Sequence, residues 1–206
     1  MKSNIPVLRD NQFNRKGLVK TKKGLLVPAY IGSGLGFNYP GQFFLNDFYS
    51  RLQGEAGVLP LCPFESCGSF LDLSELNDSM SLREAREFWG YFGTKIVGPV
   101  NYRGLMPKSK MMIALLEGQT VDEGLAAEIP EFLHTNKGPL VGIRSDFRLA
   151  ENMSAPINLA IAHFFHNIHE NPFRFRTYFV QGPAKRETYD AAISLIRDIA
   201  DAIRKR

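Results

Sequence analysis

The amino-acid sequence predicts a single α/β domain built on an open, doubly wound sheet of the flavodoxin or Rossmann type. Short apolar runs of strand length alternate along the chain with longer amphipathic segments of helical length. A length of 206 residues and a hydrophobic content of 44% suit one domain with one core. We therefore expect residues 25–206 to form five mostly parallel strands with helices on both faces, after a basic N-terminal extension at residues 1–24.

Five apolar runs are predicted to form the strands, and turn residues bound most of them. The first run ends in the glycine-rich turn that begins at Gly32, and the second is short because Pro60 and Pro63 interrupt it. The third run ends at Glu117. The predicted strands are residues 25–32, 58–61, 111–116, 139–143 and 175–180.

Five segments with apolar residues on one side are predicted to form the helices that connect and cover the strands. The last of them carries its apolar stripe on Ala192, Ile196 and Ile199. Residues 62–78 are expected to form a polar loop, and residues 145–155 a mobile loop. The predicted helices are residues 42–53, 81–92, 121–133, 157–168 and 189–203.

The third strand and the helix after it carry two carboxylates that indicate a catalytic site. In parallel sheets, ligands bind at the carboxyl ends of the strands, where loops and helix N-termini converge. Asp122 lies at that end, and Glu128 follows among apolar neighbours such as Ala127 and Ile129. A buried carboxylate is costly unless it is paired, so these acids predict covalent or acid–base chemistry on a small polar substrate. In the simpler alternative, Asp122 only stabilises the helix N-terminus and Glu128 faces solvent.

The glycine-rich turn after the first strand predicts a close approach of a ligand to the backbone. Gly32, Gly34 and Gly36 leave N–H groups accessible to a phosphate or a sugar. Their G-x-G-x-G spacing differs from the G-x-G-x-x-G of dinucleotide sites, and no acidic residue ends a clear second strand. We therefore do not expect a dinucleotide cofactor.

No metal or other cofactor is predicted. His163, His166 and His169 recur every three residues in a predicted helix, so only neighbours share a face and all three cannot bind one ion. Cys62 and Cys67 lack a second pair of ligands nearby for zinc, and two cysteines do not make a disulfide framework.

The net charge of +4 is concentrated at the two ends of the chain. Among the basic residues of the first 23 positions only Phe13 supplies an aromatic side chain, so a solvated extension is favoured over a nucleic-acid arm. No apolar run approaches the roughly 20 residues of a membrane span, and the N-terminus lacks the apolar segment of a secretory signal. We expect a cytoplasmic protein with no membrane and no nucleic-acid partner.

Three short motifs follow one another along the chain. Residues 30–34 read Tyr-Ile-Gly-Ser-Gly and are followed by Phe37; residues 122–128 read Asp-Glu-Gly-Leu-Ala-Ala-Glu; residues 155–159 read Ala-Pro-Ile-Asn-Leu. In order and approximate spacing, from about residue 25 to residue 166, they resemble the motifs of the nucleoside 2-deoxyribosyltransferase family.

The resemblance implies a role for each matched residue. Glu128 would be the nucleophile that attacks the anomeric carbon of a 2-deoxyribosyl group, and Tyr30 would orient its carboxylate. Asp122 would hold the sugar hydroxyls or assist proton transfer at the base. Phe37 would stack on the base. Asn158 would reach the 5′-hydroxyl region of a neighbouring subunit's site, so the resemblance also implies a homo-oligomer.

The chain departs from the family in its basic N-terminal extension and in Glu117-Gly118, which stands where the family commonly has Asp-Gly at the end of the third strand, and a third departure bears on the chemistry. The family usually has an aspartate about twenty residues before the position of Asp122, and here that neighbourhood reads Asn101-Tyr102-Arg103. Base protonation, and with it the choice between purine and pyrimidine, therefore stays open.

Three functions fit the residues. The first is transfer of a 2-deoxyribosyl group from a deoxynucleoside to a free nucleobase. The second keeps the nucleophile but gives the sugar to water, which makes a hydrolase of 2′-deoxynucleosides or of their 5′-monophosphates. Ser33, with the N–H groups of Gly32 and Gly34, would bind the substrate and could hold a phosphate. The third is a module that senses a nucleotide or nucleoside derivative without turnover.

Overall fold

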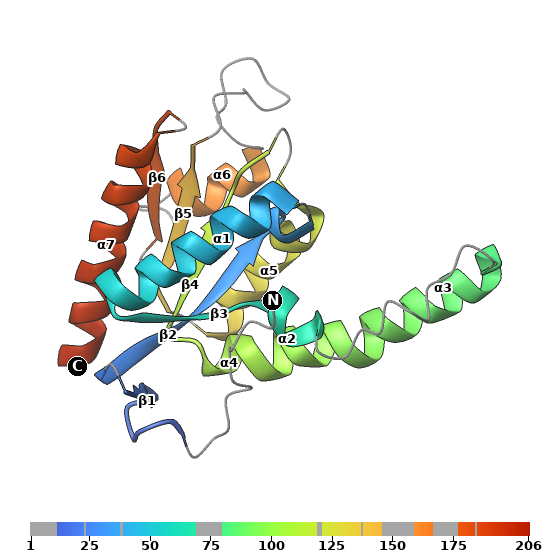
Figure 1. The fold of residues 1–206 in the computed structure, drawn as a ribbon, viewed down its shortest axis with the longest axis horizontal. Helices are drawn as coiled ribbons and strands as arrows, with labels where there is room; N and C mark the ends of the chain where they lie inside the picture. Colours follow the sequence, from blue (N-terminus) through green and yellow to red (C-terminus); the bar gives the residue numbers. More distant parts are fainter. Residues whose placement is uncertain are drawn as a thin grey trace.

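The computed structural model has a central sheet flanked by helices, and one long helix extends away from this body (Figure 1). The structure describes residues 12–22, 24–37, 39–68, 80–118, 121–136, 138–145, 159–166, 177–183 and 185–206.

Five of the six described strands are parallel and lie in the order β3-β2-β4-β5-β6, while β1 pairs antiparallel with the start of β2. Counted along the chain, the parallel strands have the order 2-1-3-4-5 of flavodoxin-like sheets. The order reverses between β2 and β4, so the carboxyl ends of these two strands border the crevice in which such folds bind ligands. The strands are β1 Val19–Thr21, β2 Gly24–Ser33, β3 Val58–Leu61, β4 Met111–Leu115, β5 Leu140–Arg144 and β6 Thr177–Gln181.

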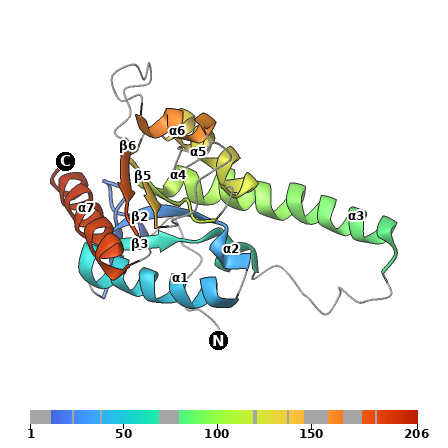
Figure 2. The same cartoon turned by 90° about the horizontal axis from the view of Figure 1, so that it is seen from above.

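Helices cover both faces of the sheet, as the view from above shows (Figure 2). Helices α1 and α7 bury one face against side chains such as Ile31 and Ile113, and α5 and α6 bury the other against Met112 and Ala114. Because side chains alternate along a strand, Tyr30 belongs to the α5 face, one residue before Ile31. The helices are α1 Tyr39–Arg51, α2 Pro63–Gly68, α3 Leu82–Tyr91, α4 Met106–Lys108, α5 Glu123–Thr135, α6 Leu159–His166 and α7 Arg186–Lys205.

Short helical segments lie beside these helices. They are the 3-10 turn η2 Leu35–Phe37 and the π-helical segments η3 Leu52–Ala56, η5 Phe92–Val97 and η6 Pro99–Leu105.

The predicted fold class is confirmed: the sheet is mostly parallel and doubly wound, with helices on both faces. The five predicted strands each correspond to an observed one, with ends that differ by one or two residues. Residues 175–176, where the last predicted strand begins, lie outside the described residues. At the N-terminus, Val19–Thr21 of the expected extension forms β1 and adds to the sheet beside Leu26.

The segment predicted as a polar loop at residues 62–78 begins with a helix, α2, so that prediction was wrong for residues 63–68. Proline is well suited to a first helical position because its missing N–H group would have no partner there. A six-residue helix is too short to show a periodic apolar pattern, which is why the sequence did not reveal it.

The helix predicted for residues 81–92 is also longer than expected. It begins with a capping box in which Ser81 and Glu84 satisfy each other's backbone N–H groups, and it continues through η5, η6 and α4 to Lys108. Gly98 and Pro99 are residues that commonly interrupt a helix. A π-helical turn is wider than an α-helical one, and the helix continues past Pro99 in this wider form.

Candidate active site

Glu128 and Tyr30 meet between α5 and the central strand β2. The Tyr30 hydroxyl donates a hydrogen bond to Glu128 Oε1 at 2.6 Å. Tyr30 is fully buried and the Glu128 side chain is 9% exposed, between Leu125 and Ile129 on the inner side of α5. The prediction that Glu128 is a buried carboxylate is therefore confirmed, and the solvent-facing alternative is wrong.

Asn101 supplies a second hydrogen bond to the same carboxylate oxygen. Its Nδ2 donates to Glu128 Oε1 at 3.1 Å, and its Oδ1 accepts a weak bond from the thiol of Cys67 at 3.8 Å. Asn101 is 3% exposed and comes from η6, at the base of the long helix. Because Tyr30 and Asn101 both bind Oε1, the carboxylate is held in one orientation, and neither of these donors binds Oε2.

Glu128 Oε2 lies beside the glycine turn. A Cβ atom at position 32 would lie 3.3 Å from Glu128 Oε2 and would collide with Leu125. Gly32 therefore lets the Leu125 side chain and the Glu128 carboxylate pack closely against the backbone of β2.

Burial raises the pKa of Glu128 to about 7. The hydrogen bond from Tyr30 opposes this increase, the negative charge of Asp122 adds to it, and the hydrogen bond from Asn101 opposes it. Burial, and then the neighbouring charge of Glu128, raise the pKa of Tyr30 far above its ordinary value, so the phenol keeps its proton. The site therefore holds a carboxyl group whose pKa lies near neutral pH, and a tyrosine that stays a donor.

Asp122 lies at the N-terminus of α5 and faces the glycine turn. Its Oδ1 accepts a hydrogen bond from the Leu125 N–H at 3.0 Å, so it is the N-cap of the helix. Its Oδ2 would lie 3.4 Å from a Cβ atom at position 34. Asp122 thus has the helix-capping role of the simpler alternative and also borders the site. Ser33 is buried, and its hydroxyl accepts a hydrogen bond from the Leu35 N–H.

Two predicted site residues are not placed. Asn158 lies outside the described residues, and for Phe37 the structure describes the backbone, in η2, but not the side chain. His169 and the start of the helix predicted at residue 157 also lie outside the described residues.

Sequence reasoning missed three residues around Glu128: Asn101, Cys67 and Tyr102. Burial raises the pKa of Cys67 to about 11, so its thiol keeps the proton that it shares with Asn101. Burial, and then the charge of Glu128, raise the pKa of Tyr102, which is 38% exposed at the edge of the site. The signal for Asn101 was present, because it stands where the family usually has an aspartate; nothing in the sequence marks the other two.

A cluster of polar residues fixes the turn that follows β4. Arg144 is 1% exposed, and its guanidinium donates to the carbonyl oxygens of Leu116 and Gly118. Glu117 Oε1 accepts hydrogen bonds from the Ser145 N–H at 2.7 Å and from the Tyr189 hydroxyl at 2.8 Å. These bonds tie together the ends of β4 and β5 and α7, beside the loop that leads to Asp122.

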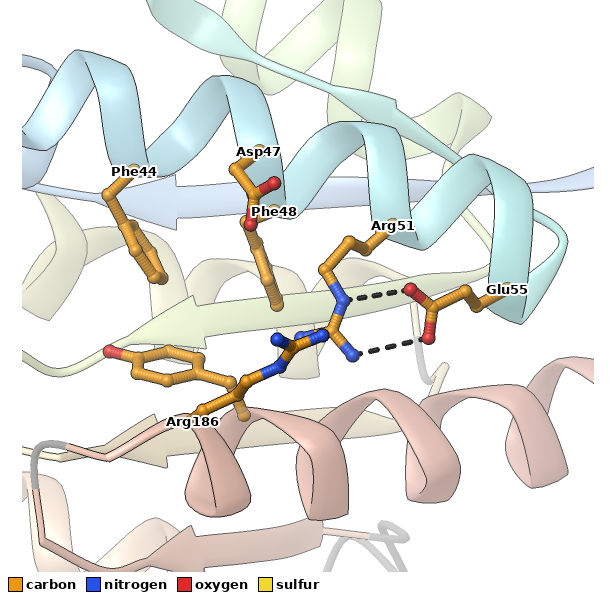
Figure 3. Close-up of a pocket in the computed structure, with 7 residues that line it drawn as sticks. Phe44, Asp47, Phe48, Arg51, Glu55 and Arg186 are labelled. Atoms are coloured by element: carbon orange, nitrogen blue, oxygen red, sulfur yellow. Dashed lines mark hydrogen bonds and ion pairs between the residues drawn. The ribbon is translucent and has the colours of Figure 1, made fainter.

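The other face of the sheet carries a groove of about 500 Å³ between α1 and α7 (Figure 3). Its lining combines aromatic rings with charged groups, but Arg51 already donates to Glu55 at 2.8 and 3.2 Å and to Asp190 at 2.7 Å. The guanidinium is thus engaged in ion pairs at a partly exposed surface. The groove is lined by Phe44, Asp47, Phe48, Arg51, Glu55, Arg186 and Tyr189.

In the part of the chain that the structure describes, no three His, Cys, Asp or Glu side chains gather closely enough to hold a metal ion. None of the described helices combines the length and apolar character needed to cross a membrane.

No family model matches the sequence, and no curated protein matches it either. Among solved structures, the chain is similar to a 2-desoxiribosyltransferase from Leishmania mexicana, with 17% identity and a TM-score of 0.43 over 82% of this chain and 97% of that one. It is similar to a conserved protein from Enterococcus faecalis V583, with 16% identity and a TM-score of 0.44 over 88% and 99% of the two chains.

A flavodoxin-like domain from Synechococcus sp. matches with 12% identity and a TM-score of 0.43 over 87% of this chain and 99% of that domain. At scores of 0.44 or lower, these three matches give no indication of activity.

Proposed function

We propose that this protein transfers a 2-deoxyribosyl group from a deoxynucleoside to a free nucleobase through a covalent bond to Glu128. The observation that carries the proposal is the geometry of Glu128: the carboxylate is buried, two donors hold Oε1, and Oε2 lies beside the backbone of Gly32 in the glycine turn. A buried carboxylate that is oriented through one oxygen is suited to nucleophilic attack with the other.

In the first step, Glu128 Oε2 forms a bond to the anomeric carbon and the bond from that carbon to the base nitrogen breaks. The electron pair of the broken bond goes to the base, which takes up a proton. In the second step, the nitrogen of an incoming base attacks the same carbon, loses its proton, and releases the Glu128 carboxylate. An ionised carboxylate stabilises the oxocarbenium-like transition states of both steps.

The other residues bind and orient. Tyr30 and Asn101 keep Oε1 occupied, so that attack comes from Oε2. Asp122 has its Oδ2 turned toward the glycine turn, a position from which it would hold a sugar hydroxyl. Ser33 and the N–H groups of Gly32 and Gly34 would contact the substrate, and Phe37 would stack on the base. The protein would be a homo-oligomer in which Asn158 completes the site of a neighbour.

The test is incubation with a deoxynucleoside, with and without a second free base, followed by chromatography. A new nucleoside supports transfer, whereas deoxyribose and base without a new nucleoside would replace transfer by hydrolysis. No reaction with any deoxynucleoside or its 5′-monophosphate would overturn catalysis and leave a sensing module.

The covalent step has its own test. A 2-deoxy-2-fluoro nucleoside slows both steps, because fluorine disfavours the oxocarbenium-like transition states, and it allows the glycosyl-enzyme to accumulate when the leaving base is good. Mass spectrometry should find the fluorosugar on the peptide that contains Glu128. The Glu128→Gln protein should carry no adduct, and the matched variant Glu123→Gln, on the exposed first turn of the same helix, should carry as much as the wild type. An adduct on another residue would refute the assignment.

A further inference from the structure

The long helix that extends from the domain has an apolar side that is largely exposed; within the described chain, α2 contacts its η5 end. We call residues 82–97, formed by α3 and η5, the arm; it projects from the body in both views (Figures 1 and 2). None of its residues is buried, and Leu82 and Trp89 are 83% and 49% exposed. An isolated helix that exposes large apolar side chains is marginally stable in water unless a partner covers them.

The apolar residues of the arm have the spacing of a coiled-coil seam. They recur at alternating steps of three and four, which places them on one side of the helix. Phe88 flanks this seam, and its ring contacts those of Trp89 and Phe92. The seam residues are Leu82, Ala85, Trp89, Phe92 and Ile96.

The seam is complementary to itself in the antiparallel direction. In the register that places Trp89 against the partner's Phe92, the small Ala85 lies against the partner's Ile96, so two central aromatic layers are flanked by layers that pair a small side chain with a large one. Glu84 and Lys95 lie on the same flank of the seam. In an antiparallel pair, residues of the same flank meet, so Glu84 approaches the partner's Lys95 on each side of the two-fold axis.

We propose that the arm is an interface between two copies of this chain, which pair antiparallel along residues 82–97. A parallel pair would leave Ala85 against the partner's Ala85 and crowd the two Trp89 rings, so the antiparallel pair packs better. In this register residues 84–97 of the two arms overlap over roughly 20 Å, and Leu82 lies against the partner's Pro99. Asn101, which binds Glu128, follows on the same continuous helix, so the pair would also fix the base of the arm beside the site.

The first experiment measures self-association of the full-length protein by sedimentation velocity. The wild-type protein should be a dimer, or a larger even-numbered assembly, at micromolar concentration. Trp89→Glu should raise the dissociation constant at least about tenfold, because a charge then lies in the seam of both copies. Phe43→Glu, which changes an exposed phenylalanine on α1, is the matched control and should associate like the wild type. A monomeric wild type, or a Trp89→Glu protein of unchanged mass, would overturn the proposal.

The second experiment tests the direction of pairing by disulfide cross-linking. The proteins Ala85→Cys and Ile96→Cys should cross-link when they are mixed under oxidising conditions, whereas Ala85→Cys alone should not. Native Cys62 and Cys67 are buried, and the wild type is the control for them. Cross-linking of Ala85→Cys alone would show a parallel pair, and no cross-link in the mixture would also refute the proposed register. Both readouts are masses, so they do not depend on the proposed catalytic activity.

Discussion

Each face of the sheet has a tyrosine that donates to a glutamate, and the two pairs have different surroundings. On the α5 face, Tyr30 and Asn101 bind one oxygen of Glu128. At the end of β4, Tyr189 and the Ser145 N–H bind one oxygen of Glu117. The hydrogen-bond pattern is the same, but Glu128 is buried in a helix face opposite a glycine, whereas Glu117 ties a turn at the end of a strand. Burial, more than the number of hydrogen bonds, therefore distinguishes the proposed nucleophile Glu128 from the partly exposed Glu117.

The largest expected difference between the two glutamates is in catalysis. Glu128→Gln should lower kcat about a thousandfold or more, because an amide cannot form the glycosyl ester. Glu117→Gln keeps an oxygen that can accept both hydrogen bonds, so its activity should stay within about tenfold of the wild type. Initial rates with a deoxynucleoside and a second base give both values. Equal losses of kcat in the two variants would show that Glu128 and Glu117 do not differ in their contribution to catalysis.

The turn held by Glu117 can be weakened from its other side. Arg144→Met removes a buried guanidinium that donates to the carbonyl oxygens of Leu116 and Gly118 and leaves both acceptors without that donor. We expect a loss of about 2–4 kcal/mol in the free energy of unfolding. Urea denaturation measures it, and Arg51→Met, which removes partly exposed ion pairs to Glu55 and Asp190, is the control with an expected loss of about 1 kcal/mol or less. Similar losses would show that burial does not decide the strength of these contacts.

The raised pKa of Glu128 should make stability depend on pH. Its pKa is about 7 in the folded protein against an ordinary value of 4.5, so the folded protein holds the proton more tightly. The wild type therefore loses stability as the pH rises from 4.5 to 7, by at most about 3 kcal/mol. Glu128→Gln lacks this titration, so its free energy of unfolding should rise relative to that of the wild type between pH 4.5 and pH 7. Urea denaturation at pH 5 and pH 8 checks the sign, and a constant difference between the two proteins would contradict the raised pKa.

The sequence predicted the fold well because the strands are continuous apolar runs. Residues 111–115 form a continuous apolar run, which is typical of a strand covered on both faces, and all five are buried in β4. Glu128 was recognisable because it interrupts an apolar helix face, and Tyr30 only through the family resemblance. Helix α2 was missed because it is too short to show a periodic apolar pattern. The continuation of the long helix to Lys108 was missed because it contains Gly98 and Pro99.

The contact between Asn101 and Glu128 could not be predicted from the sequence. These residues are 27 positions apart, and their meeting depends on the path of η6, a π-helical segment with no sequence pattern of its own. The bond from Cys67 depends on α2 and η6 together. Local patterns indicate which elements form, but contacts between elements that are far apart in sequence depend on how those elements pack.

The smallest expected effect concerns Asn101, which donates a hydrogen bond to Glu128. Asn101→Asp replaces the Nδ2 donor with a second carboxylate beside Glu128. Because the two negative charges repel each other, Glu128 holds its proton more tightly and its pKa rises above about 7. We expect activity at pH 7 to fall about tenfold and to recover at higher pH, because the ionised form of Glu128 is the reactive one. Asn101→Ala removes the bond without adding charge, so its pH profile should shift less. Profiles of kcat/KM between pH 5 and pH 9 measure both shifts. Higher activity of Asn101→Asp at pH 7 would mean that an acid at this position protonates the leaving base, and that Asn101 is not limited to orienting Glu128.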